Sequence, residues 1–318
     1  VAVVDSATGG ISVAGGSSAT LRNVTVARAG LVGIHGNYAD NLVMERVLVE
    51  DNNADRFNPA PSAGGSKITK SRGVTVRDSV FRDNHATGLW FDQSVADMKI
   101  TGSDFRGNTR GVFVEISARL VFADNIVEGN SGDGLMVNNT SRSRVWNNTF
   151  VGNTRNMVLA QDDRRPYNTS YGHDSRYPND PDMTWVVGPV EHFNNVIANP
   201  RSGAACMFCA TGYAYADDMQ ISSDHNVYNR ANTSSPSVVV LWTTGRTDDA
   251  RYYDLGSFTA ATGQDPNSVL INGSAVVTND GTPTSSMPSA STAQPLPADI
   301  ATLVDQPGGT RHHGAWTL

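Results

Sequence analysis

The chain is poor in charge, in lysine and in cysteine, and each shortage argues against a class of protein. Charged residues make up only 17% of its 318 residues and lysine occurs three times, whereas long helices favour alanine, leucine, glutamate and lysine. No apolar run approaches the roughly 20 residues that a membrane span needs. The net charge of −7 and the lack of a basic cluster argue against nucleic acid as the main partner.

Glycine, asparagine, serine, threonine and valine are abundant instead. Apolar triplets such as Val24-Thr25-Val26 recur along the chain, which argues against disorder. Low charge combined with modest hydrophobicity predicts a β-rich protein with many turns.

The two cysteines, Cys206 and Cys209, lie in the sequence Cys-Met-Phe-Cys. A redox motif with this spacing is expected near a βαβ pattern, which the sequence lacks, and a zinc site needs two more ligands nearby. We therefore expect either a local disulfide or two free thiols. No signal peptide is visible, and the sequence begins in a strand-like run at residues 1–4, so we expect a mature or trimmed chain.

Internal periodicity is the strongest signal in the sequence. Similar segments begin at glycines 65, 88, 111 and 134, each 23 residues after the last, and a weaker copy begins at Asn156. Earlier copies begin at Gly10 and Gly33. The step of 32 residues between positions 33 and 65 implies an insertion of about nine residues there.

Each copy carries two further strand-like runs and an asparagine turn. Residues 21–26, 42–47 and 74–76 exemplify the second run, and 80–81, 126–127 and 150–151 the third. The turn asparagines are Asn52, Asn84, Asn108, Asn130 and Asn153. Three short strands per 22–23 residues are typical of an all-β right-handed parallel β-helix, whose coils stack about 4.8 Å apart. Buried asparagines can then stack, each amide bonding the next.

Two rival folds fit the repeat less well. A leucine-rich repeat needs a characteristic leucine spacing that is missing, and a β-sandwich would not hold so even a step. We expect a single domain over 1–318, with regular coils to about residue 160 and irregular coils with a C-terminal cap over about 185–318. A cap is needed because a bare β-helix end is an open sheet edge. We expect Gly314-Ala-Trp to close that end.

Alternation along the first strand of each copy predicts two columns of outward-facing side chains. In the copy that begins at Gly88, Leu89 and Phe91 point inward, whereas Trp90 and Asp92 point outward. The same rule gives a first column of Ser12, His35, Lys67, Trp90, Phe113 and Met136. The second column is Ala14, Asn37, Thr69, Asp92, Glu115 and Asn138.

Asp92 and Glu115 are one coil apart, which places their Cα atoms about 4.8 Å apart on an outer face. Like charges in opposed strand positions repel, so one carboxyl tends to keep its proton, and an acid and a base stand side by side. Glycosidases use such a pair. A carboxyl separation of about 5–5.5 Å suits a retaining mechanism and about 6.5–9.5 Å an inverting one, and one-coil stacking is nearer the first. The alternative is a solvated acid pair without a role.

Neighbouring outward residues predict a sugar-binding face beside these acids. Trp90 and Phe113 can stack on the apolar faces of sugar rings, unless loops cover them. Lys67 and His35 can hydrogen-bond sugar hydroxyls or tune the acids, although a solvated role is the simpler reading of each. Asn138 continues the column of the acids and is a further candidate contact.

Two insertions, 51–64 and 161–184, border the same strands and can wall a cleft. Loops of this length in a compact fold are usually functional. We expect substrate contacts from Arg56 in the first insertion and from Gln161 and Asp162 in the second. Arg164 and Arg165 can bind an anionic sugar, but we expect a surface role for each.

The chain resembles secreted right-handed parallel β-helix proteins of the pectate-lyase-like superfamily over nearly its whole length. The resemblance depends on the coils, on Asp224-His-Asn-Val-Tyr, on the segment 254–265 and on the Gly314-Ala-Trp ending. The sequence Gly88-Leu-Trp-Phe-Asp92, followed by Val-Glu115-Ile-Ser, is similar to the acid pair of β-helix glycoside hydrolases such as the family 120 β-xylosidases and their relatives in family 141. The resemblance implies that Asp92 is the nucleophile and Glu115 the acid/base, and that the protein is secreted or at the cell surface.

Three functions remain open from the sequence. The leading hypothesis is a retaining glycoside hydrolase that acts on a poly- or oligosaccharide without a cofactor or metal. The second is a polysaccharide lyase or uronate epimerase with Lys67 as the base and a cation held by Asp92 and Glu115, although the Asp-rich cluster of calcium-dependent lyases is not evident. The third is a non-catalytic carbohydrate-binding solenoid, which would tolerate loss of either acid but not of Trp90.

Overall fold

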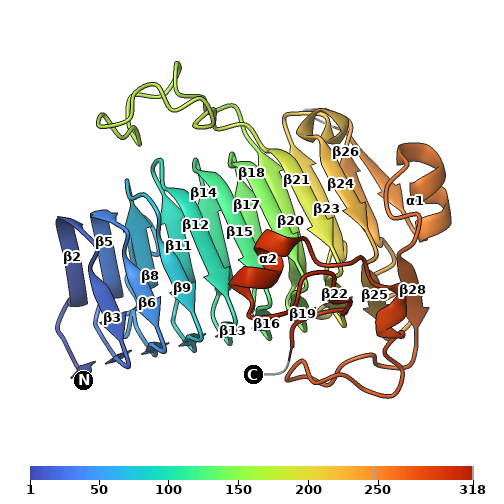
Figure 1. The fold of residues 1–318 in the computed structure, drawn as a ribbon, viewed down its shortest axis with the longest axis horizontal. Coiled ribbons are helices and arrows are strands. Elements are labelled where there is room, and N and C mark those ends of the chain that lie inside the picture. The colour runs from blue at the N-terminus through green and yellow to red at the C-terminus, as the bar shows by residue number, and fades with distance from the viewer. Residues whose placement is uncertain (246–247, 317–318) are drawn as a thin grey trace.

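The computed structural model describes residues 1–245 and 248–316, and it shows three long sheets wound into a parallel β-helix (Figure 1). Neighbouring strands are parallel except for the pair β26 and β27. From β2 to β25 each coil contributes one strand to each sheet, so the strands of a sheet come from successive turns of the chain.

The sheets are named here A, B and C. Sheet A contains β1 (Ala2–Val4), β4 (Thr25–Ala27), β7 (Leu48–Glu50), β10 (Val80–Arg82), β13 (Asp104–Arg106), β16 (Ile126–Glu128), β19 (Thr149–Val151), β22 (Val196–Ala198), β25 (Val227–Arg230) and β28 (Val269–Asn272). Sheet B contains β2 (Gly9–Ser17), β5 (Val32–Asp40), β8 (Gly64–Thr69), β11 (Thr87–Asp92), β14 (Arg110–Glu115), β17 (Asp133–Asn138), β20 (Arg155–Gln161), β23 (Phe208–Gly212), β26 (Val240–Thr243) and β27 (Asp249–Tyr252). Sheet C contains β3 (Thr20–Arg22), β6 (Val43–Glu45), β9 (Thr75–Arg77), β12 (Ala96–Thr101), β15 (Ala118–Ala123), β18 (Ser141–Trp146), β21 (Gly188–Phe193) and β24 (Ile221–Asp224).

The pairing register of sheet B reproduces the repeat that the sequence predicts. Thr87 lies opposite Gly64 on one side and Arg110 on the other, so a 23-residue step carries each position onto its neighbour. The insertion expected between positions 33 and 65 is also confirmed, since the chain makes a loop between β7 and β8.

A narrow apolar core runs along the axis of the solenoid. Phe81, Phe105, Phe122 and Phe150 are fully buried, and their rings follow one another at centroid distances of 5.1, 6.1 and 6.2 Å. Each coil therefore buries its large side chains against the coils on either side, as a solenoid requires.

The predicted asparagine stack is present as a continuous ladder. The Nδ2 atoms of Asn52, Asn84, Asn108 and Asn130 each donate to the Oδ1 atom of the next asparagine, and Asn153 donates to Asn156. A second ladder, which the sequence did not reveal, contains Asn125, Asn148, Asn195 and Asn226. These amides satisfy polar groups that the turns bury inside the protein.

The C-terminal region covers the last coils. Helix α1 (Leu255–Thr262) begins at Asp254, whose side chain accepts a hydrogen bond from the Ser257 amide, and its Phe258 packs on Trp242. Together with the antiparallel strand β27, this helix closes the end of the solenoid. Short 3₁₀ turns, η1 (Ala216–Met219) and η2 (Ala290–Thr292), lie in the connecting segments.

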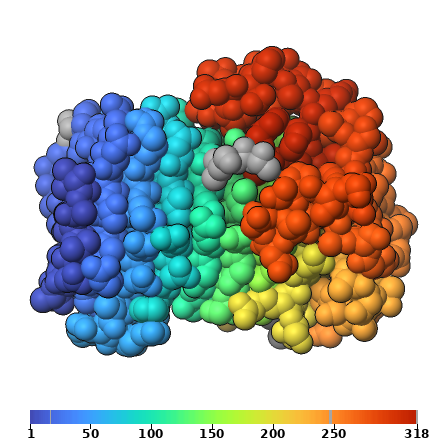
Figure 2. All heavy atoms as spheres, turned by 90° about the horizontal axis from the view of Figure 1, so that it is seen from below, coloured from blue at the N-terminus to red at the C-terminus, as the bar shows by residue number. Residues whose placement is uncertain are grey.

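The expectation that Gly314-Ala-Trp closes the end is wrong. The amide of Ala315 donates to Thr149 Oγ1 and that of Trp316 donates to Asp124 Oδ1, so this ending lies against the side of the middle coils. Helix α2 (Ala298–Leu303) packs nearby on the outer face of sheet C through Ile300 and Ala301. Figure 2 shows these C-terminal segments gathered over one half of the molecule, while the N-terminal coils stay uncovered on that face.

Two further features bear on the expectations from the sequence. Cys206 and Cys209 form a disulfide, so the first of the two alternatives for these thiols holds. None of the helices in the described part of the chain is long and apolar enough to cross a membrane.

Candidate functional site

The outer face of sheet B carries both predicted columns in register. Lys67 pairs with Trp90, and Trp90 with Phe113, along the first column. Leu89 and Phe91 are fully buried in the core, which confirms the predicted alternation along β11. Asp92 and Glu115 end their strands one coil apart, directly after the paired residues Phe91 and Val114.

Asp92 is held by a buried ion pair. The Lys67 Nζ atom lies 2.7 Å from Asp92 Oδ2, and only 5% of the lysine side chain and 9% of the aspartate side chain are exposed. The same ammonium donates to the carbonyl oxygen of Pro61 and lies 3.3 Å from the centroid of the Trp90 ring. All three neighbours therefore interact favourably with a cation.

Glu115 is held by a cation from a distant part of the chain. The Arg164 Nη2 atom lies 2.6 Å from Glu115 Oε1 and 2.7 Å from Asp162 Oδ2. The surface role expected for Arg164 is thus wrong, because the loop folds back and places its guanidinium beside the acid pair. Arg165 matches the expectation better, since it donates to the backbone carbonyl oxygens of residues 162 and 164.

Three neighbouring charges and burial give Glu115 an unusual environment. Burial raises the pKa of Glu115 above its ordinary value, and the negative charge of Asp92 raises it further. Arg164 and Lys67 act in the opposite direction, but they do not cancel the increase in pKa. The protonated form of Glu115 is thereby favoured more than in an ordinary glutamate, whereas Asp92 stands against an ammonium group.

The two aromatic residues are covered more than the sequence suggested. Trp90 and Phe113 stack on each other with ring centroids 5.4 Å apart, and the Arg110 guanidinium lies 4.5 Å from the centroid of the Phe113 ring. Phe113 is only 8% exposed, which leaves little of its surface for a sugar ring. Within the described residues, the buried Trp90 Nε1 atom has no hydrogen-bond partner.

A cavity of about 250 Å³ lies next to Lys67 on the side of the N-terminal coils, and neither Asp92 nor Glu115 lines it. Its lining includes the predicted contacts His35 and Lys67, and it also contains Lys70. Burial and the charge of Lys67 lower the pKa of His35, so the imidazole is neutral at neutral pH. Its remaining lining residues are Asn37, Pro61, Ser62, Thr69 and Gln93.

The other predicted contacts have different surroundings. Asn138 pairs with Glu115 across the strands, and its buried Oδ1 atom is an acceptor without a partner in residues 1–245 and 248–316. Asp162 lies against Arg164 and so belongs to the site. Arg56 is exposed on the first insertion.

Gln161 anchors a loop. Its side chain is buried, its Nε2 atom donates to Asn139 Oδ1 and to the carbonyl oxygens of Asp162 and Trp185, and its Oε1 atom accepts from the Val187 amide. These bonds assign the amide a role in holding the loop, and the substrate contact expected from Gln161 stays a prediction.

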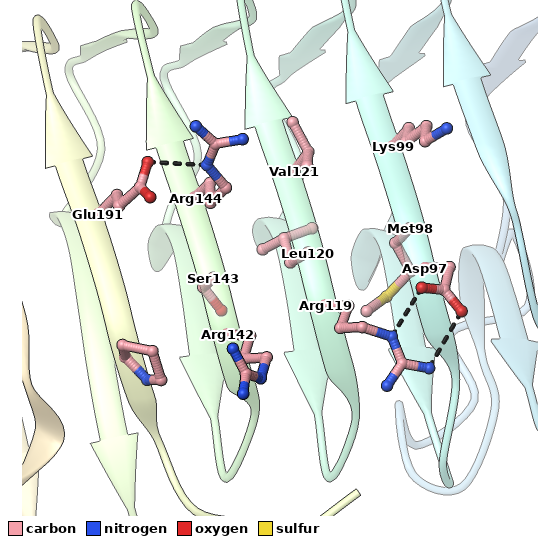
Figure 3. Close-up of a pocket in the computed structure, with 11 residues that line it drawn as sticks. Asp97, Met98, Lys99, Arg119, Leu120, Val121, Arg142, Ser143, Arg144 and Glu191 are labelled. Atoms are coloured by element: carbon pink, nitrogen blue, oxygen red, sulfur yellow. Dashed lines mark hydrogen bonds and ion pairs between the residues drawn. The ribbon is translucent and has the colours of Figure 1, made fainter. Parts of the chain in front are cut away.

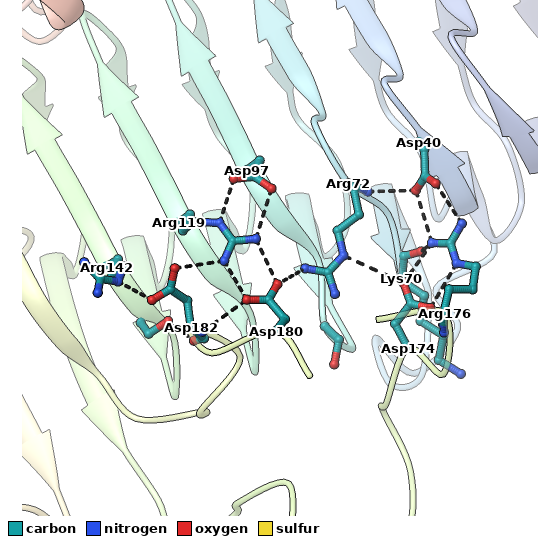
Figure 4. A network of polar contacts seen from close by, with 12 residues as sticks. Asp40, Lys70, Arg72, Asp97, Arg119, Arg142, Asp174, Arg176, Asp180 and Asp182 are labelled. Carbon is teal, nitrogen blue, oxygen red and sulfur yellow. Dashed lines mark hydrogen bonds and ion pairs between the residues drawn. The ribbon is translucent and has the colours of Figure 1, made fainter. Parts of the chain in front are cut away.

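The long loop between β20 and β21, residues 162–187, is called the strap here. It runs back over the N-terminal coils along one edge of the solenoid, and Figure 1 shows it above the ends of the strands. Arg119 binds Asp180 and Asp182 of the strap, and Arg176 of the strap binds Asp40 (Figure 4). The sequence shows the aspartates of this loop but not their arginine partners, which lie up to 108 residues away.

A second cavity, of about 330 Å³, lies on the outer face of sheet C. Its charged groups largely pair with each other, as Figure 3 shows for Arg119 with Asp97 and for Arg144 with Glu191. No sequence pattern pointed to it. Among the residues that the structure describes, no three or more His, Cys, Asp or Glu side chains are grouped so that they could hold a metal ion.

Comparison with known proteins supports the architecture. Residues 2–155 match the family model described as a right handed beta helix region. No curated protein matches the chain.

Solved structures give only distant likeness. The A-module of the mannuronan C-5 epimerase AlgE6 from Azotobacter vinelandii is 14% identical over 81% of this chain, with a TM-score of 0.43, and the chain covers 57% of that module. Two structures of QnrB1, a plasmid-mediated fluoroquinolone resistance protein, are 13% and 10% identical over 51% and 54% of this chain, with TM-scores of 0.19 and 0.21, and the chain covers 83% and 89% of them. The family match and the parallel register together confirm that the chain folds as a right-handed parallel β-helix.

Proposed function

We propose that the protein is a retaining glycoside hydrolase in which Asp92 is the nucleophile and Glu115 is the acid/base. One observation carries the proposal: two carboxyls end neighbouring strands, and their environments differ. Asp92 contacts the Lys67 ammonium at 2.7 Å, while burial and the Asp92 charge raise the pKa of Glu115. A nucleophilic carboxylate next to a protonated carboxylic acid is the starting state of a double displacement.

In the first half of the reaction, the Asp92 carboxylate attacks the anomeric carbon and Glu115 transfers its proton to the leaving oxygen. The bond between these two substrate atoms breaks, and Asp92 becomes an ester without charge. One of the causes that raise the pKa of Glu115 is then gone, while Arg164 and Lys67 still lower it. Glu115 therefore changes from an acid to a base as the intermediate forms.

The contacts of Lys67 favour hydrolysis over a lyase or epimerase reaction. A general base needs a free lone pair near the proton that it removes. The Lys67 nitrogen instead contacts the Asp92 carboxylate, the Pro61 carbonyl oxygen and the Trp90 ring, and each of these interacts with the ammonium form. A purely binding role is less favoured as well, because the Lys67 ammonium and the Phe113 ring both lie against the Trp90 ring, which is only partly exposed.

The disulfide supports a site of action outside the cell or at its surface. Disulfides persist in oxidising compartments and are rare in the cytosol of most organisms. The Cys206–Cys209 bridge is therefore in keeping with an extracellular enzyme that meets its polysaccharide there. Fractionation of producing cells tests this placement, and recovery of the protein only from the reduced cytosol would contradict it.

The function is tested with Asp92→Ala and Glu115→Ala on aryl glycosides and a panel of polysaccharides. Both variants should lose turnover of natural glycans while they keep the folded β-sheet signal in circular dichroism. Added azide should restore product formation by Glu115→Ala on an activated aryl glycoside, because azide needs no general base.

Asp218→Asn is the matched control for these two variants. Asp218 is an exposed acid in the 3₁₀ turn η1, and its loss should leave activity unchanged. Full activity in either acid variant would contradict the proposal. An unsaturated product absorbing in the ultraviolet would show elimination instead of hydrolysis.

A further inference from the structure

Arg164 reaches the acid pair through a short chain of contacts. The Asn139 side chain, which is fully buried, donates to Asp162 Oδ1 and accepts from the Asp162 amide. The Asp162 carboxylate accepts from Arg164 Nε at 2.9 Å, and Arg164 Nη2 lies 2.6 Å from Glu115. Asp162 and Glu115 thus both contact the Arg164 guanidinium and fix its orientation before any substrate binds.

The rest of the strap keeps this arrangement in place. Asp180 and Asp182 contact Arg119, and Ser94 donates to the carbonyl oxygen of Gly172 (Figure 4 shows the ion pairs). These contacts come from several coils, so the strap is bound along its length and not only at its two ends. Arg164 is thus held directly by Asp162, and it lies in a strap that is bound to the coils along its length.

The charges around Glu115 change during a double displacement. In the free enzyme, Asp92 and Arg164 act on Glu115 in opposite directions. Once Asp92 is an ester, its negative charge is absent, and the Arg164 and Lys67 cations face Glu115 without it. Arg164 therefore lowers the pKa of Glu115 in both states, but in the covalent intermediate the charge of Asp92 no longer opposes it.

We propose that Arg164 is a positioning residue for the second half of the reaction, where it holds Glu115 as a carboxylate ready to accept a proton from water. This role rests on the proposed function. In that step the water oxygen bonds to the anomeric carbon and its proton passes to Glu115. The bond from that carbon to Asp92 breaks, and Asp92 returns as a carboxylate beside Lys67.

The experiment compares Arg164→Gln and Arg164→Lys with the wild type on an aryl glycoside that carries a good leaving group. Release of the phenolate is followed in the pre-steady state. Arg164→Gln should show a burst and then a kcat lowered roughly 10- to 100-fold, since general base catalysis is impaired. Azide should restore kcat in this variant, and Arg164→Lys should lie between it and the wild type.

Arg165→Gln is the matched control, because it removes a neighbouring cation whose guanidinium bonds to backbone carbonyl oxygens of the same loop. It should behave as the wild type in the burst and in kcat. If Arg164→Gln slows both halves of the reaction equally, or if azide fails to restore its kcat, the proposal is overturned.

A second measurement does not depend on turnover. Carbon-13 titration of the Glu115 carboxyl should show its midpoint at a higher pH in Arg164→Gln than in the wild type, and unchanged in Arg165→Gln. A midpoint that does not move overturns the role of Arg164 even in an active hydrolase. Absence of a glycosyl–Asp92 adduct in the wild type, examined by mass spectrometry, instead overturns the proposed function and this role with it.

Discussion

Replacing Lys67 by methionine tests how the site is built. Methionine keeps most of the side-chain volume, but it leaves the Asp92 carboxylate without the ammonium that lies 2.7 Å from it. Both side chains are more than nine-tenths buried, so water replaces the lost contact poorly. Removing one partner of a buried ion pair typically costs about 3–5 kcal/mol, which we expect as the fall in the free energy of unfolding at neutral pH.

The double variant Lys67→Met/Asp92→Asn separates the pair from the packing. Replacing both members of a buried pair is often close to neutral, so the double variant should be more stable than Lys67→Met alone. A double-mutant cycle should give an interaction energy of about 2–3 kcal/mol between the two residues. Urea unfolding followed by tryptophan fluorescence measures all four proteins under one set of conditions.

Lys70→Met serves as the control, because Lys70 lines the same cavity and its ammonium lies 5.7 Å from the centroid of the Tyr38 ring. Its effect should stay within about 0.5 kcal/mol. Two results would refute the reasoning. One is a Lys67→Met variant no less stable than Lys70→Met, and the other is a double variant whose loss equals the sum of the two single losses.

Three further predictions concern stability away from the site. Asn108→Ala should lower the free energy of unfolding by about 3 kcal/mol or more, because it leaves several buried hydrogen-bonding groups of the ladder without partners. A loss below about 1 kcal/mol in urea unfolding would contradict this. Burial raises the pKa of Asp124 from 3.8 to about 7, so its carboxyl destabilises the fold increasingly as the pH rises through that range. Asp124→Asn should therefore gain up to about 3 kcal/mol relative to the wild type between pH 5 and pH 8, and a constant difference in urea unfolding at both pH values would speak against it. Joint replacement of Cys206 and Cys209 by serine should cost about 2 kcal/mol, since the disulfide closes only a short loop, and calorimetry that shows no change in Tm would argue against the bridge in solution.

The fold was readable from the sequence because two signals have one physical cause. A Cβ atom added at Gly88 would lie 2.8 Å from the carbonyl oxygen of Gly111 and 2.9 Å from Asn108 Nδ2. The ladder asparagine therefore packs where a larger side chain at the glycine position would lie. For this reason the glycine and the asparagine recur together, at the same step. Where the strap interrupts the chain, as between Asn148 and Asn195, the step is 47 residues, which hid the second ladder.

The site was only partly readable. Alternation along β11 identified Trp90 and Asp92 as outward-facing, but it does not reveal which long side chains fold over them. Lys67 covers Trp90, and this contact depends on side-chain rotamers that a sequence does not show. The surface position expected for Arg164 was wrong because the sequence does not show the path of its loop either. The path of its loop is set by ion pairs such as that of Arg72 with Asp180, whose partners are 108 residues apart.

The acid pair lies at the junction of two coils, and neither coil contains it alone. Residues 111–133 form one repeat, and the same 23-residue step carries β11 onto β14 and β14 onto β17. A chain from which this repeat was deleted would keep its glycines, core and ladder in step, but it would bring Asn138 against Asp92. The contacts that stabilise the solenoid thus repeat from coil to coil and do not depend on the order of the coils. The acid pair, in contrast, depends on which two coils are adjacent.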